Sequence, residues 1–148
     1  GSCITTATNI WFADNPQAKT ICISGTAGKS TTSSLLAHLL GEAGLAARLA
    51  GNIGEPMLGI DAGATDWWVI ELSSYQIADF DGQPDMALLL NISQEHLDWH
   101  RGFEAYVNDK LRLAELAAGG VRIANWGDPL LRAALPLPLV NSSSRPGA

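Results

Sequence analysis

The stretch "SGTAGKSTT" (residues 24–32) joins the apolar run "TICI" (20–23) to "SSLLAHLLGEAG" (33–44), whose leucines recur at helical spacing. This pattern predicts a buried strand over 20–24 and a helix over 29–43, with a glycine where helices often end. A glycine-bearing turn between a strand and a helix raises one question. It either binds phosphate or only connects the two elements.

The turn has the residues that a phosphate-binding loop needs. Its backbone N–H groups and the positive end of the following helix can face an anion, Lys29 adds a mobile cation, and Ser30 adds a hydroxyl group. The common pattern places another glycine where Ile23 stands, so the match is to a shorter variant, G-x-x-G-K-S. The alternative is that Lys29 and Ser30 merely begin a helix. The candidate phosphate-binding residues are Gly25, Thr26, Ala27, Gly28, Lys29, Ser30 and Thr31.

Short apolar runs alternate with helical patterns along the rest of the chain. Strands are expected over 46–51, 67–72, 86–92 and 121–125, and helices near 51–58, 102–120 and 128–135. This alternation predicts right-handed βαβ units and a doubly wound, mostly parallel α/β sheet. The expected organisation is a linker or the end of a preceding region over 1–19, one domain over 20–140 and a disordered tail over 141–148.

The composition excludes several classes of function. Hydrophobic residues make up 47% of the 148 residues, so a sizeable core can form. The formal net charge is −6 with no basic block, which argues against a nucleic-acid surface. No apolar run reaches the ~20 residues that span a bilayer, so no membrane partner is expected. Cys3 and Cys22 have no metal-type spacing, which favours a reduced, cytoplasmic protein.

Polar residues follow three of the expected strands, and the carboxyl ends of parallel strands are where ligands collect. Asn52 follows the second strand, Glu71 and then Ser73 end the third, and Asn91 lies at the end of the fourth. A carboxylate beside a phosphate loop is a plausible Mg²⁺ partner, but Glu71 could equally cap a helix or loop. Ser73 is not a predicted nucleophile, because the G-x-S-x-G turn is absent.

Two further features of the sequence concern ionisable residues. His96 and His100 would share a helical face, but no third and fourth ligand stand at a suitable spacing for a zinc site. Lys110 falls in the middle of the apolar face of the expected 103–117 helix. A buried ammonium is costly, so Lys110 either extends along its stem to solvent or is a functional lysine directed into the site.

Five segments together resemble the central ATP-binding domain of the Mur ligase family. They are "GTAGKSTT", "AGNIGEP", "IELSSYQ", "LNISQEHLDWH" and "YVNDKLRL", in family order and at family spacing from about Thr20 to Asn125. Ala27 stands where the family loop frequently has Asn. The segments "SSYQ" and "EHLDWH" are most similar to those of the family branch that adds glutamate, including its variant that adds L-glutamate.

The resemblance implies a role for each matching residue. It implies that Lys29 contacts the β- and γ-phosphates of ATP, that Asn52 and Ser73 position the substrate, and that Lys110 becomes carbamylated. The implied catalytic residues are Lys29, His96 and Lys110. The implied Mg²⁺ ligands are Ser30, Glu71, His96 and the carbamylated Lys110.

The implied reaction is ATP-driven amide formation through an acyl phosphate, with UDP-N-acetylmuramoyl-L-alanine and glutamate as substrates and ATP and Mg²⁺ as cofactors. The family's enzymes carry further domains, so the resemblance implies that 148 residues are an inactive part of the central domain, and self-association through an open sheet edge is possible. Three other interpretations remain. The first is another Mur or folylpolyglutamate-type ligase, and the second is a regulatory module that binds nucleotide without ligase chemistry. In a third, the loop binds no nucleotide at all.

Overall fold

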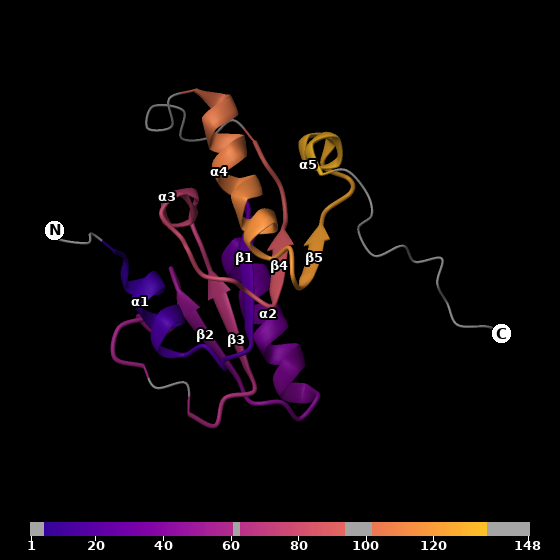
Figure 1. The fold of residues 1–148 in the computed structure, drawn as a ribbon. Helices are drawn as coiled ribbons and strands as arrows, with labels where there is room; N and C mark the ends of the chain where they lie inside the picture. Colours follow the sequence, from indigo (N-terminus) through magenta and orange to yellow (C-terminus); the bar gives the residue numbers. More distant parts are fainter. Residues whose placement is uncertain (1–4, 61–62, 94–101, 136–148) are drawn as a thin grey trace, which may run out of the picture.

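The computed structural model describes residues 5–60, 63–93 and 102–135. Within these ranges one parallel sheet has the strand order β2-β3-β1-β4-β5 (Figure 1). The strands are Thr20–Ser24 (β1), Ala47–Gly51 (β2), Trp67–Glu71 (β3), Met86–Leu89 (β4) and Val121–Ala124 (β5). The helices are Ala7–Asp14 (α1), Lys29–Glu42 (α2), Ser74–Ala78 (α3), Phe103–Leu116 (α4) and Pro129–Ala134 (α5). The predicted doubly wound α/β fold is confirmed.

Strand β1 lies in the middle of the sheet. Every residue of β1 is buried, and Cys22 pairs with Ile70 of β3 on one side and with Ala87 of β4 on the other. A parallel strand covered on both faces needs a continuous apolar sequence, and "TICI" supplies one. The loop that follows β1 therefore begins at the centre of the sheet's carboxyl edge.

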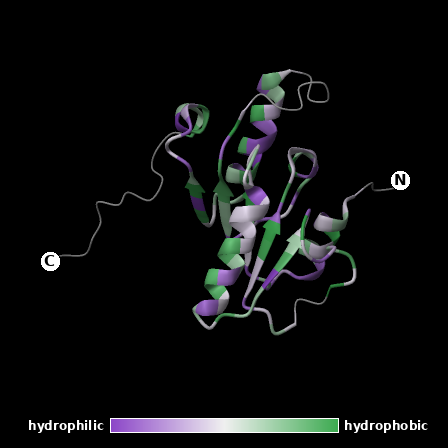
Figure 2. Cartoon of the chain, turned by 180° about the vertical axis from the view of Figure 1, so that it is seen from behind, coloured by the Kyte–Doolittle hydropathy of each residue, from purple (hydrophilic) through white to green (hydrophobic). Residues whose placement is uncertain are grey.

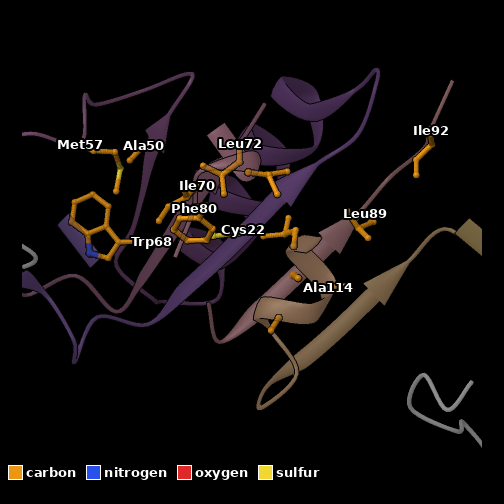
Figure 3. Packing of buried hydrophobic residues seen from close by; sticks show 14 of the residues in the cluster. Cys22, Ala50, Met57, Trp68, Ile70, Leu72, Phe80, Leu89, Ile92 and Ala114 are labelled. Carbon is orange, nitrogen blue, oxygen red and sulfur yellow. The ribbon is translucent and has the colours of Figure 1, made fainter. Parts of the chain in front are cut away.

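Helices cover both faces of the sheet. On one face α2 packs against β1, β2 and β3 (Figure 2). Leu36 and Leu40 of this helix pack against a buried cluster that includes Val69. On the other face the larger core includes side chains from α1, α3 and α4. Trp68 and Ile70 of β3 and Ala114 of α4 belong to this core (Figure 3). The two layers hold β1 and the loop after it from both sides.

Three local features differ from the expectations. The helix expected near 51–58 is absent: Gly51 and Gly54 have φ angles of 95° and 77°, and the Glu55 N–H donates back to the Leu49 carbonyl, so the chain turns instead. Helices α1 and α3 were not expected. In α2, Leu35 and Leu39 are 55% and 54% exposed, so only part of the predicted apolar stripe faces the sheet.

The chain has no helix, within the ranges that the structure describes, of the length and apolar character needed to cross a membrane.

Candidate active site

The glycine-rich loop opens directly onto α2. Gly28 is the N-cap residue of this helix, with a φ of 84° and no side-chain cap. The first-turn N–H groups therefore have no capping side chain and face the loop, which is the arrangement that binds anions. Gly25 is needed for a different reason, because a Cβ there would lie 2.9 Å from Cβ of Leu90.

Asn91, just after β4, holds the loop through both its backbone and its side chain. Its carbonyl oxygen accepts from the Thr26 N–H at 3.0 Å. Its side-chain Oδ1 accepts from the Ala27 N–H and its Nδ2 donates to the Ala27 carbonyl, each at 2.9 Å. Ala27 thus contributes its N–H to Asn91 in this structure, and the loop donors that remain toward α2 begin at Gly28.

Two polar side chains at the start of α2 have defined partners. The Lys29 ammonium donates to the Gly25 carbonyl at 2.9 Å, so it folds back over the loop. The Ser30 hydroxyl donates to Oε2 of Glu71 at 3.0 Å. Glu71 ends β3 and is only 4% exposed. A carboxylate and a hydroxyl at this spacing suit Mg²⁺, which takes one or two protein oxygens and fills its other positions with water and phosphate oxygens.

Lys110 lies on the inner face of α4 and is 2% exposed. Its ammonium lies 4.9 Å from the centre of the Tyr106 ring, a cation–π distance. Burial, and then the positive charge of Lys29, lower the pKa of Lys110 from 10.5 to about 8. The predicted inward position of Lys110 is confirmed, and the lysine does not reach solvent along its stem.

One small cavity joins the loop to α3 and α4. Its volume is about 70 Å³, and its lining includes the two lysines, Lys29 and Lys110. The remaining lining residues are Gly25, Thr26, Ser73, Ser74, Tyr75 and Tyr106. The structure thus brings together the loop, the predicted substrate residue Ser73 and the predicted functional lysine, which are up to 85 residues apart in the sequence. An anion in this cavity would lie near two lysine side chains.

The other predicted site residues lie around this cavity or outside the described ranges. Asn52 is exposed, and its N–H donates to the Glu71 carbonyl at 3.1 Å, so its loop starts beside the site without lining the cavity. Thr31 is exposed in the first turn of α2. His96 falls in 94–101, which the structure does not describe. No group of three or more metal-ligating His, Cys, Asp or Glu side chains occurs in the described part of the chain.

Ser73 has a structural role as well as a place in the cavity. It is the N-cap of α3 and forms a capping box with Gln76: each side chain bonds the other's backbone N–H, at 3.3 and 2.9 Å. The "SSYQ" segment therefore begins a short helix that carries Ser73 and Ser74 to the loop.

Sequence reasoning did not assign functions to Asn91 and Tyr106. Asn91 was expected near the loop, but its hold on Ala27 was not predicted. Tyr106 was assigned only to the apolar face of its helix, yet its hydroxyl group lies 2.8 Å from the Thr26 hydroxyl. The available signal was chemical, because a buried tyrosine hydroxyl usually has a hydrogen-bond partner.

The chain is similar to known proteins over most of its length. The model of the Mur ligase middle domain matches residues 23–141. A UDP-N-acetylmuramoyl-L-alanine–L-glutamate ligase from Xylella fastidiosa (strain Temecula1) is 48% identical over 141 residues, covering 88% of this chain and 30% of the relative. The chain therefore spans about 30% of the length of this relative.

Solved structures share the fold. A crystal structure of MurF from Acinetobacter baumannii aligns with a TM-score of 0.64 and 21% identity, over 86% of this chain and 32% of that one. The E. coli FolC structure in complex with DHPP and ADP aligns with a TM-score of 0.57 and 14% identity, over 84% of this chain and 47% of that one. Because the family model covers most of the chain, this protein belongs to the Mur ligase family and carries its middle domain.

Proposed function

We propose that this chain is the ATP-binding part of a ligase that adds L-glutamate to UDP-N-acetylmuramoyl-L-alanine during peptidoglycan synthesis, in the cytoplasm. The Xylella relative carries the name of this activity, including L-glutamate as the amino acid. Since the chain spans about 30% of that relative, we propose that it cannot complete the reaction alone.

The observation that carries this proposal is the placement of Lys29 and Lys110 on one cavity, beside the Ser30–Glu71 pair. Transfer of a phosphoryl group spreads negative charge over its oxygens, and fixed positive charge next to it lowers the barrier. A turn that only connected a strand to a helix would not need a second, buried lysine on the same cavity as its own lysine.

We assign the phosphates of ATP to the loop and Lys29. The N–H groups from Gly28 onward and the Lys29 ammonium would bind the β- and γ-phosphates, and ADP in the FolC structure shows that a protein of this fold can bind such a nucleotide. Mg²⁺, when bound to Ser30 and Glu71, would offset further charge on the phosphates. His96 belongs to the same proposed metal site.

Lys110 is proposed to be carbamylated. A carbamate forms when the unprotonated amine adds carbon dioxide and releases a proton, and a pKa of about 8 leaves more of the unprotonated amine near neutral pH than an ordinary lysine has. The carbamate would be an anion directed toward the proposed Mg²⁺. This charge reversal also removes the repulsion between Lys110 and Lys29.

Asn52 and Ser73 are proposed to position the UDP-linked substrate at the edge of the site. In the proposed reaction the substrate carboxylate takes the γ-phosphoryl group and ADP leaves. The glutamate amine then attacks the acyl phosphate, loses a proton and releases inorganic phosphate.

The proposal is tested by titrating Mg²⁺-ATP into the 148-residue chain in a calorimeter. Lys29→Ala should lose at least about tenfold in affinity, because a charge-assisted contact to phosphate is removed. Lys19→Ala is the matched control: it removes the same charge at the other end of β1, where Lys19 lies over Trp67. Equal binding by the wild-type chain and Lys29→Ala would contradict the assignment of the loop. Amide product from the chain alone would contradict its proposed incompleteness.

A regulatory nucleotide-binding module remains the competing function. Its binding of nucleotide would need Lys29 but not Lys110. In the longer ligase, Lys110→Ala should abolish amide formation while ATP still binds. A full rate with Lys110→Ala would rule against the ligase mechanism proposed here.

A further inference from the structure

The Thr26 hydroxyl contacts two other segments of the chain. It belongs to the loop after β1, and it accepts a hydrogen bond from the Ser93 N–H at 2.9 Å, from the segment after β4. The hydroxyl group of Tyr106, on α4, lies 2.8 Å away. Thr26 is therefore fixed by two elements that are 67 and 80 residues further along the chain.

Tyr106 contacts the loop and Lys110 with different parts of one side chain. It is 1% exposed and stands four residues before Lys110, so both side chains lie on the same face of α4. Its hydroxyl group reaches Thr26, while its ring lies against the Lys110 ammonium at 4.9 Å. A shift of this ring would disturb both contacts at once.

We propose that Tyr106 is a positioning residue that holds the phosphate loop and Lys110 in a single arrangement ready for nucleotide. The inference rests on the proposed nucleotide site. The Tyr106 hydroxyl fixes the loop at Thr26, next to the residues whose N–H groups face the phosphates. Without this hydrogen bond Thr26 would keep its contacts with Asn91 and Ser93 but lose its contact with α4, so part of the loop's ordering would fall to nucleotide binding, and that ordering lowers affinity. A tyrosine that only filled the core would act through its ring alone.

The test measures ADP affinity by calorimetry for Tyr106→Phe, Thr26→Val and the double variant. Tyr106→Phe keeps the ring and removes the hydroxyl, so affinity should fall about fivefold, the usual effect of one neutral hydrogen bond. Thr26→Val removes the partner and should weaken binding at least as much. The double variant should bind no more weakly than Thr26→Val, because both changes break the same contact.

Two results would overturn the inference while leaving the proposed function intact. One is an ADP affinity of Tyr106→Phe equal to that of the wild-type chain. The other is a loss of binding free energy in the double variant that equals the sum of the losses in the two single variants. If the wild-type chain bound no ADP, the proposed function would fail instead, and amide exchange in the ligand-free chain would then decide the inference. Tyr106→Phe should speed exchange of the Ser93 amide about fivefold relative to the Val69 amide in β3. An unchanged ratio of the Ser93 and Val69 exchange rates would overturn the inference.

Discussion

The hydroxyl oxygen of Ser30 lies 3.0 Å from Oε2 of Glu71, although the two residues are 41 positions apart. They meet because β1 and β3 are neighbours in the sheet, with Ile23 paired to Glu71, so the start of α2 passes over the end of β3. A hydroxyl and a carboxylate are thereby held together beside the loop before any ligand arrives.

Removing either member of this pair should weaken the effect of Mg²⁺ on nucleotide binding. We expect Ser30→Ala and Glu71→Gln each to reduce the strengthening of ATP binding by Mg²⁺ about tenfold, because each takes away an oxygen ligand or its charge. Calorimetry with and without Mg²⁺ measures the difference. Ser34→Ala, on the exposed side of α2 one turn later, is the control. An unchanged Mg²⁺ dependence in both variants would remove this pair from the metal site.

Lys110 should make the stability of the chain depend on pH in the alkaline range. Its pKa is 10.5 ordinarily and about 8 in the folded chain, so between these values the unfolded chain binds more protons. The free energy of unfolding therefore rises as pH increases from about 8 to 10.5, and the cost of the buried ammonium is fully present below pH 8. The shift corresponds to a gain on the order of 3 kcal/mol.

Urea unfolding of the wild-type chain and Lys110→Met across this pH range isolates the contribution. The methionine variant should be the more stable one at pH 7, and the difference should shrink as pH rises. Other titrating groups are common to both proteins and cancel in the comparison. A difference that stays constant from pH 7 to pH 10.5 would mean that Lys110 has an ordinary pKa.

Two glycine-to-alanine changes should have opposite effects on stability. At Gly51, φ is 95° and a Cβ would overlap the Glu71 carbonyl oxygen, so Gly51→Ala should cost about 2 kcal/mol or more. Gly41 lies within α2 with open space around it, so Gly41→Ala should stabilise by roughly 0.5–1 kcal/mol. Thermal unfolding of the two variants checks both signs. A neutral Gly51→Ala would show that this strand end can move away from β3.

Strand β5 is at an edge of the described sheet, and we expect copies of the chain to associate there. Ile123 on this strand is 50% exposed, and an edge strand with an exposed apolar side chain favours pairing between molecules. Sedimentation at rising concentration should show association of the wild-type chain that Ile123→Lys weakens. Leu58→Lys, at a residue 60% exposed outside the strands, is the control. A monomer at every concentration would contradict the expectation.

The sequence predicted the fold well where pattern and burial coincide. The apolar runs in β1 and β3 predicted buried strands, and both strands are buried along most of their length. Lys110 was predicted to lie on the apolar face of its helix, and it is buried there. The bend at Gly51 and Gly54 was missed because it depends on close contacts in the folded chain, of Gly51 with Glu71 in β3 and of Gly54 with Leu49 in β2. Helix α3 was missed because five residues hold too little periodicity, although Ser73 and Gln76 stand at capping-box spacing.

The polar and charged residues of the candidate site could be predicted from the sequence, but the residues that hold them in place could not. Lys29, Ser30 and Glu71 belong to local patterns at strand and helix ends. Asn91 and Tyr106 act through contacts with residues 64 and 80 positions away, and only the order of strands in the sheet brings these together. The residues next to Asn91 or Tyr106 in the sequence do not indicate the order of the strands.

The contact between α1 and the sheet gives the molecule an internal optical signal. Trp11 of α1 packs against Trp68 of β3 with ring centres 5.2 Å apart and planes at 67°, and both rings are buried. Two buried indoles in a fixed contact differ from indoles in water in their near-ultraviolet circular dichroism and in their fluorescence. Detachment of the N-terminal helix from the strand that ends in Glu71 can therefore be followed by spectroscopy without adding a dye.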